Sequence, residues 1–213
     1  MATKQTRSKF RQAFAEFDEI NTFWVEKMDL SRAEKKLRVE MMQDFQQRIE
    51  EVPKPEKERK KSYIVFAAIG YVAYKLLYTE FAEKYYKRYL SAIGVSNPQV
   101  SDFAAYWIAA HAEMFAGYEH TNPKATARTE TNALGSLAQL DAFSQLGYNA
   151  KQWVTMQDAK VRQTHKEANG QTVLLEEPFI IGNSFMMFPQ DSSLGAGAEE
   201  IVNCRCVMKP AHL

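Results

Sequence analysis

The chain has 213 residues, of which 46% are hydrophobic and 25% are charged, a length and composition suited to one substantial domain or two small ones. Its formal net charge of +1 excludes a general electrostatic attraction to nucleic acid, so any such binding must come from a local basic patch. Its two cysteines lie two positions apart, which excludes the disulfide framework of a small secreted protein and predicts a reducing cytoplasm.

The first predicted elements are two amphipathic helices that form a hairpin over residues 8–52. Aromatic and aliphatic residues recur at helical spacing through residues 8–28. Ser31 and Glu34 make up a capping box, which predicts that a second helix begins there. Pro53 ends this second helix, because proline has no N–H for the helical hydrogen bond.

The segment 53–61 is predicted to be a linker in which basic side chains outnumber acidic ones. Clustered basic side chains can contact phosphates, and the candidates for a contact with double-stranded DNA are Lys57, Arg59, Lys60 and Lys61. A solvated linker or a first helical turn accounts for the same charges, and we favour that interpretation.

A long helix is predicted over residues 62–92. Its first half is apolar nearly all round, but the uninterrupted apolar run stops at Lys75, short of the ~20 residues that a membrane-spanning helix needs. Beyond Lys75 the apolar residues form a stripe on one face, which is typical of a water-exposed helix with one buried side. We therefore expect no contact with a membrane, and the apolar end of the helix is a candidate surface for docking a protein partner.

Another helix is predicted over residues 101–119, after a turn at Asn97 and Pro98. It contains His111 among alanines, which we interpret as a core or groove histidine rather than a metal ligand. Together these elements make residues 1–122 a mostly helical region of long amphipathic helices.

Residues 123–213 are predicted to form a small, irregular α+β domain, so the expected fold class is α+β. The domain opens with a helix over residues 124–146. Short apolar runs at 173–175 and 185–188 predict buried strands, and residues 201–207 are predicted to form the last strand.

Four polar residues of this domain are expected to meet in space. Cys204 and Cys206 alternate with Arg205 along the last predicted strand, so both thiols point to one face. Asp158 and His165 share one face if the segment that contains them is helical.

These residue types allow a metal site. Thiolates and imidazole are typical zinc ligands, so Cys204, Cys206 and His165 could hold zinc. Asp158 would then be the fourth ligand, or the carboxylate that orients His165. The alternative without a metal is a reduced thiol pair packed beside a hydrogen-bonded histidine and acid. We expect a structural role for the cluster in either case.

A catalytic interpretation uses the same residues. Cys204 or Cys206 would be the nucleophile, His165 the base and Asp158 the group that orients the base. The sequence has no glycine-rich loop or helix start beside the cysteines to form an oxyanion hole, so this interpretation is less favoured.

Several short motifs follow one another in order over residues 124–209. They begin at the segment 127–131 and continue through Trp-x-Thr-x-x-Asp, Val-Arg-x-x-His, an Asn-Gly turn, a Pro-Phe pair and a Pro-x-Asp turn to Asn-Cys-Arg-Cys. In this order and spacing they resemble the phage Mu F-like minor head protein family, also described as phage head morphogenesis proteins. Outside the cysteine cluster, the residues that carry the resemblance are Arg128, Glu130, Trp153, Arg162, Asp191 and Asn203.

The resemblance implies a structural minor head protein of a tailed bacteriophage, not an enzyme, that acts in head morphogenesis at or near the portal vertex. The implied partners are the phage portal protein and capsid or scaffold proteins, with packaged double-stranded DNA as a further candidate. The implied location is the phage head of the virion, assembled in the bacterial host cytoplasm. The alternative is an enzyme, or a toxin encoded by a prophage, that uses the cysteine cluster.

Two interpretations of Arg128 and Glu130 stay open. Both residues lie on the first turns of their predicted helix. They are either a functional pair characteristic of the family, or an acid and a base that attach this helix to the β unit. The first hundred or so residues carry no motif that matches the family.

Overall fold

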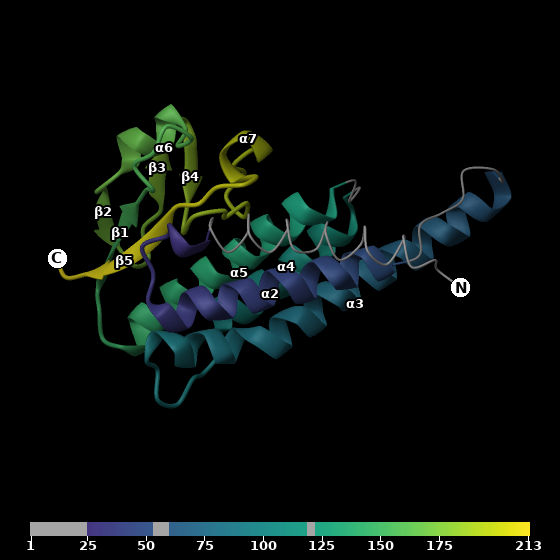
Figure 1. Ribbon diagram of the computed structural model, residues 1–213, viewed down its shortest axis with the longest axis horizontal. Helices are drawn as coiled ribbons and strands as arrows, with labels where there is room; N and C mark the ends of the chain where they lie inside the picture. The colour runs from purple at the N-terminus through teal and green to yellow at the C-terminus, as the bar shows by residue number, and fades with distance from the viewer. Residues whose placement is uncertain (1–24, 53–59, 119–121) are drawn as a thin grey trace, which may run out of the picture.

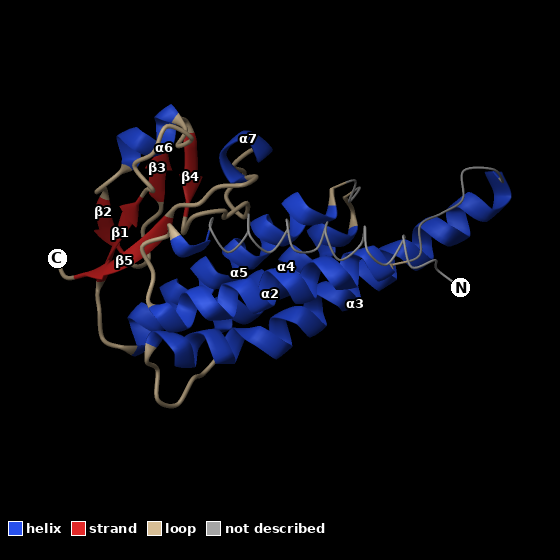
Figure 2. Cartoon of the chain, in the orientation of Figure 1, coloured by secondary structure: helices blue, strands red, loops and turns tan. Residues whose placement is uncertain are grey.

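The structure is a computed structural model that describes residues 25–52, 60–118 and 122–213. A bundle of long helices lies beside a smaller unit of short strands and helices (Figure 1, Figure 2). The fold class is therefore α+β, as predicted. The bundle consists of α2 (Arg32–Glu51), α3 (Lys60–Ile93), α4 (Asp102–Ala116) and α5 (Pro123–Gln145). The smaller unit consists of β1 (Ala150–Val154), α6 (Gln163–Ala168), β2 (Thr172–Leu174), β3 (Phe179–Ile181), β4 (Ser184–Met186), α7 (Ala198–Ile201) and β5 (Val207–Ala211).

Side-chain caps define where the bundle helices begin. Ser31 accepts a hydrogen bond from the backbone N–H of Glu34 at 3.2 Å, and its own N–H donates to the Glu34 carboxylate at 3.0 Å. The predicted capping box is therefore confirmed as the start of α2. Residues 8–24 of the predicted hairpin, and most of the predicted linker, lie outside the described residues.

The centre of the bundle is a cluster of aromatic rings contributed by three helices. Phe45 of α2 packs edge-on against Phe81 of α3 at a centroid distance of 4.4 Å and against Phe115 of α4 at 5.5 Å. Tyr78, which is fully buried, contacts both Phe45 and Phe115. Such contacts contribute about 0.5–1.5 kcal/mol each beyond the burial of their area, so the cluster fixes how α2, α3 and α4 pack.

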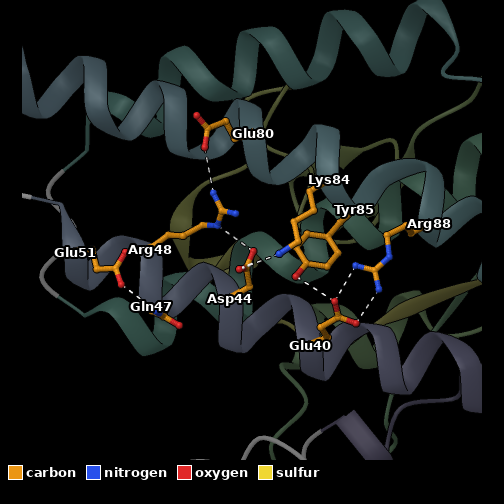
Figure 3. A network of polar contacts seen from close by, with 9 residues as sticks. All are labelled: Glu40, Asp44, Gln47, Arg48, Glu51, Glu80, Lys84, Tyr85 and Arg88. Atoms are coloured by element: carbon orange, nitrogen blue, oxygen red, sulfur yellow. Dashed lines mark hydrogen bonds and ion pairs between the residues drawn. The ribbon is translucent and has the colours of Figure 1, made fainter.

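On the outer surface of the bundle, ion pairs connect α2 to α3 (Figure 3). Arg88 makes a bidentate pair with Glu40, with distances of 2.8 and 2.9 Å. Asp44 accepts from Arg48 on its own helix and from Lys84 of α3. These side chains are partly exposed, so each pair contributes about 0–1 kcal/mol and mainly helps to align the two helices.

A buried arginine lies between α2 and α5. Arg38 is fully buried, and its Nε donates to the hydroxyl of Tyr89 at 2.5 Å while its Nη1 donates to Oδ1 of Asn132 at 2.6 Å. Gly135 leaves room for the guanidinium, because a Cβ built at Gly135 would lie 2.7 Å from Nη2. The bundle core therefore contains a charged hydrogen-bond network as well as aromatic rings.

The smaller unit contains a three-stranded antiparallel sheet in the order β2-β1-β5 and a separate β3-β4 hairpin. β1 is the central strand, with Gln152 opposite Thr172 and Trp153 opposite Met208. β1 and β3 were not predicted. The runs predicted as buried strands overlap β2 and β4, but β2 is only half-buried and Phe185 of β4 is 51% exposed.

The last strand was predicted at residues 201–207, and this prediction is wrong. Ile201 ends α7 and β5 begins only at Val207. Asn203 has a positive φ of 57°, which no β-strand residue adopts, so the chain turns there before it becomes extended. The cysteines consequently lie in the loop before β5 rather than in a strand.

α5 connects the two parts of the molecule. It packs against α2 and α3 in the bundle and also contacts β1 and β5. The predicted division of the chain into residues 1–122 and 123–213 stays a prediction.

α3 extends past the other labelled helices at its N-terminal end (Figure 1). On this part of the helix Ile69, Val72 and Leu76 are 49%, 54% and 54% exposed. Farther along, Phe81 and Tyr89 are fully buried against the bundle. Within the described segments, no helix combines the length and the apolar character that a membrane crossing requires.

Candidate metal centre

Three of the four residues predicted to form a cluster meet in the smaller unit. Nδ1 of His165 lies 3.3 Å from Sγ of Cys206 and 3.5 Å from Sγ of Cys204. The three potential ligand atoms all lie within 4.8 Å of one another. His165 is 1% exposed and each cysteine is 2% exposed, so the cluster is closed off from solvent.

The local fold explains why His165 faces the cysteines. The backbone N–H of Gly170 donates to the Trp153 carbonyl at 2.8 Å, which folds α6 back onto β1. The indole of Trp153 then packs edge-on against the His165 ring at 5.5 Å. Because β5 pairs with β1, the loop that leads into β5 passes this ring. Cys204 and Cys206 are buried in this loop, whereas Arg205 between them pairs with Asp158, so the predicted alternation of the three side chains is found although the strand is not.

The fourth predicted member, Asp158, is not in the cluster. Both of its carboxylate oxygens accept from Arg205 at 2.7 Å, and this hydrogen bond lowers the pKa of Asp158. The predicted helix over 158–166 begins only at Gln163. Asp158 instead accepts from the N–H of Lys160 at 3.0 Å, a local turn that competes with helix formation.

Glu200 of α7 takes the position that was predicted for Asp158. Its Oε2 lies 2.8 Å from Nε2 of His165 and also accepts from the hydroxyl of Thr164 at 2.9 Å. No local pattern predicts this contact, because Glu200 is 35 residues away from His165 along the chain. The acid is positioned by the fold of the loop that carries α7.

The two thiols differ in acidity. Burial by itself raises the pKa of Cys204, but hydrogen bonds with Cys206 and His165 hold that pKa well below its ordinary value. The hydrogen bond to Cys204, together with burial, raises the pKa of Cys206. Burial by itself lowers the pKa of His165, yet its contacts with Cys204 and Glu200 raise that pKa overall. The surroundings therefore favour the thiolate form of Cys204 over that of Cys206.

Glu130 pairs with a histidine rather than with the β unit. Its Oε2 lies 2.6 Å from Nε2 of His111 on α4, and both side chains are mostly buried. His111 also stacks on Trp107 at a centroid distance of 4.2 Å, which agrees with its interpretation as a core or groove histidine. No hydrogen bond or ion pair joins Arg128 to another described residue, and its Nε is buried. The interpretation of Arg128 and Glu130 as an attachment to the β unit is therefore wrong.

Other polar residues of α5 make that attachment. Oγ1 of Thr129 accepts from the N–H of Asn203 at 3.1 Å, and Nδ2 of Asn132 donates to the Cys204 carbonyl at 3.2 Å. Ser136 donates to Gln190 at 3.2 Å one turn later. These residues were missed, although their spacing of three to four positions is the signal of a polar stripe on one helix face.

The remaining residues that carry the resemblance support the fold around the cluster. Trp153 is fully buried next to His165, and Arg162 donates from Nη2 to the Val202 carbonyl at 2.5 Å. Asp191 is also fully buried and accepts from the indole N–H of Trp107 at 3.0 Å, which ties the smaller unit to α4.

A groove of about 410 Å³ lies between α4, α5 and α7. His111 and Glu130 line it together with apolar side chains that include Met114 and Ile201. Neither cysteine lines this groove. Of the candidates for DNA contact, Lys57 and Arg59 lie outside the described residues, whereas Lys60 and Lys61 form the first turn of α3.

Comparison with known protein families matches residues 78–209 to the family described as Phage Mu protein F like protein. Comparison with curated proteins and with solved structures found no match. The matched segment begins within α3, earlier than the resemblance at 124–209, and includes α4, α5 and the whole cysteine cluster. It covers more than half of the chain, which therefore belongs to the Phage Mu protein F like family.

Proposed function

We propose that this chain is a structural minor head protein of a tailed phage that acts at or near the portal vertex, without enzymatic activity. The observation that carries the proposal is the family match over residues 78–209, which supports a role in phage head morphogenesis and a location in the virion. The portal protein is the proposed partner, and capsid or scaffold proteins are further partners.

The burial of the cysteine cluster supports a structural role. Cys204 and Cys206 are each 2% exposed, so a substrate has no direct access to either sulfur. Asp158, the predicted orienting acid of a catalytic set, is engaged by Arg205 instead. An enzyme or a prophage-encoded toxin that used these thiols would need the access that burial denies.

The extended end of α3 supports a protein contact. Ile69, Val72 and Leu76 form an exposed apolar series at spacings of three and four positions, on one side of the helix. Exposed apolar patches of this kind mark sites of protein interaction. We propose this surface for the portal protein, and we propose the basic residues at the start of the same helix for contact with packaged double-stranded DNA.

Co-expression with the portal protein of the same phage tests the proposal. The wild-type chain is expected to co-purify with the portal protein, and the triple variant with Ile69, Val72 and Leu76 changed to Ser is expected to lose this association. A matched control changes Ile180 and Phe185 to Ser, because these side chains are equally exposed on the β3-β4 hairpin, and should still co-purify.

Two outcomes would contradict the proposal. The first is that the wild-type chain never associates with the portal protein, and that particles assemble and infect normally without it. The second is that the chain is absent when portal-containing particles are purified and their proteins are identified by mass spectrometry.

A further inference from the structure

We propose that the chain binds one zinc ion through Nδ1 of His165 and the sulfurs of Cys204 and Cys206, with Glu200 positioning the imidazole. The proposal extends beyond head assembly and does not depend on it. It concerns a site that lies entirely within the smaller unit and joins α6, α7 and the loop before β5.

The distances match those of a tetrahedral zinc site. Zinc binds sulfur at about 2.3 Å and imidazole nitrogen at about 2.0 Å, so at a tetrahedral angle the nitrogen and each sulfur lie about 3.5 Å apart. Nδ1 of His165 lies 3.3 Å from the sulfur of Cys206 and 3.5 Å from that of Cys204. An ion can therefore enter with only a small movement of the side chains.

Glu200 selects the nitrogen that faces the sulfurs. A carboxylate can only accept a hydrogen bond, so its contact of 2.8 Å with Nε2 places a proton on that nitrogen of His165. Nδ1 is then the nitrogen that can offer a lone pair to a metal. Histidine ligands of zinc commonly donate their other N–H to a carboxylate in this way. The hydroxyl of Thr164 holds the same carboxylate oxygen at 2.9 Å.

Donors around the sulfurs favour their negatively charged form. The backbone N–H of Cys206 points at the sulfur of Cys204 at 3.4 Å. The indole Nε1 of Trp153 is buried and completes no hydrogen bond in the described chain. A thiolate at Cys206 would be an acceptor for this N–H in the closed site, because a thiolate accepts hydrogen bonds.

Thiolate and imidazole ligands in a tetrahedral arrangement select zinc over calcium or magnesium, which prefer oxygen. The described residues supply three ligands to this closed site.

Metal analysis of the untagged full chain, purified without chelators, tests the proposal. Native mass spectrometry and elemental analysis are expected to find about one zinc ion per chain. X-ray absorption at the zinc edge should show two sulfurs at about 2.3 Å and one imidazole nitrogen at about 2.0 Å. This measurement needs no variant, so it holds even if the cysteine variants fail to fold.

Variants then identify the ligands. Cys204→Ser, Cys206→Ser and His165→Ala should each abolish stoichiometric zinc, and Glu200→Gln should weaken zinc affinity about 10–100-fold in competition with a chelator. His111→Ala is the matched control, because His111 also pairs with a buried carboxylate but faces no thiol, and it should retain zinc. Asp158→Asn should retain zinc as well.

Three results would overturn the proposal. One is a folded wild-type chain that takes up no zinc even when the ion is supplied during refolding. Another is an absorption spectrum that shows only oxygen and nitrogen around the zinc. The last is loss of zinc from the His111→Ala control to the same extent as from Cys204→Ser.

Discussion

Asn132 of α5 donates a hydrogen bond from Nδ2 to the backbone carbonyl of Cys204 at 3.2 Å. Its Oδ1 accepts from the guanidinium of Arg38 at 2.6 Å. Arg38 and Asn132 are fully buried, and Cys204 is 2% exposed, so water cannot replace either bond. One amide thus connects the charged core of the bundle to the loop that carries the cysteines.

Removal of this amide should destabilise both parts of the molecule. Asn132→Ala leaves Nη1 of Arg38 without its partner, whereas the Cys204 carbonyl keeps the hydrogen bond from Gln190 at 2.7 Å, so the cost should be about 1–3 kcal/mol in the free energy of unfolding. Urea unfolding followed by circular dichroism measures the change. Asn149→Ala is the control, because Asn149 bonds the exposed backbone of Leu213, and it should change stability by less than ~0.5 kcal/mol. Equal effects of the two substitutions would show that the buried hydrogen bonds of Asn132 contribute no more to stability than the exposed ones of Asn149.

Alanine substitutions at two helical glycines should change the stability of the protein in opposite directions. Gly135→Ala places a methyl group 2.7–3.1 Å from three atoms of the Arg38 guanidinium, which should cost about 1–3 kcal/mol of stability. Gly70→Ala in α3 meets no atom within 4 Å, so it should gain up to about 1 kcal/mol from the better helix propensity of alanine. Thermal unfolding of both variants gives the comparison, and a stabilised Gly135→Ala would mean that Arg38 can move aside without cost.

Lys151 should make stability depend on alkaline pH. This fully enclosed side chain donates to the Leu175 carbonyl at 2.7 Å, and burial lowers its pKa from 10.5 to about 8. Since the pKa in the folded state lies below that of the unfolded chain, the unfolded state binds more protons between pH 8 and 10.5. Stability therefore rises with pH in that window, and below pH 8 the full cost of the buried charge remains.

Lys151→Met isolates this effect, because it removes the titrating group and leaves the other ionisable groups in place. Between pH 8 and 10 the unfolding free energy of the wild type should rise relative to that of the variant by about 2 kcal/mol. Urea unfolding of both proteins across this range measures the difference. Parallel pH profiles would mean that Lys151 titrates normally.

The basic segment allows a test of DNA contact. Changing Lys57, Arg59, Lys60 and Lys61 to Gln should leave the fold intact, because charges in such a segment contribute little to stability. If the segment contacts DNA, the loss of about four phosphate contacts should flatten the dependence of log affinity on log salt by roughly 3 to 4. Fluorescence anisotropy with double-stranded DNA at several salt concentrations gives this slope.

A matched control removes four exposed lysines elsewhere and should leave the slope nearly unchanged; these are Lys36, Lys87, Lys160 and Lys166. An unchanged slope in the basic-segment variant would show that this segment does not contact DNA.

The long helices could be predicted because their signals are local. The predicted bounds of 62–92 and 124–146 differ from those of α3 and α5 by one or two residues at each end. Apolar periodicity, the Ser31 capping box and glycines with positive φ after the helices act within a few residues of the chain. The contact of His165 with both cysteines could also be predicted, because residue chemistry and alternation suggested it.

The acid beside His165 could not be predicted. Asp158 is near His165 in sequence but is bound by Arg205, whereas Glu200 reaches His165 from a separate helix. Whether Asp158 or Glu200 lies beside His165 depends on the turns of the chain between them. Turns leave no periodic pattern in the sequence from which this could be predicted. The last strand was misplaced for the same reason, because the turn at Asn203 depends on its hydrogen bond to Thr129 of α5.

The two halves of α3 should differ in their local free energy of opening. Around Phe81 and Tyr89 the helix is held by buried contacts, and its amide protons can exchange with solvent only when the bundle itself opens. Around Ile69 and Val72 these two side chains gain little from packing, and the nearby contacts of Tyr71 and Lys75 with Glu113 of α4 are exposed polar ones, which stabilise a helix only weakly. A partner that covered this end would supply the missing packing. Part of its binding free energy would then stabilise the helical conformation of this end of α3.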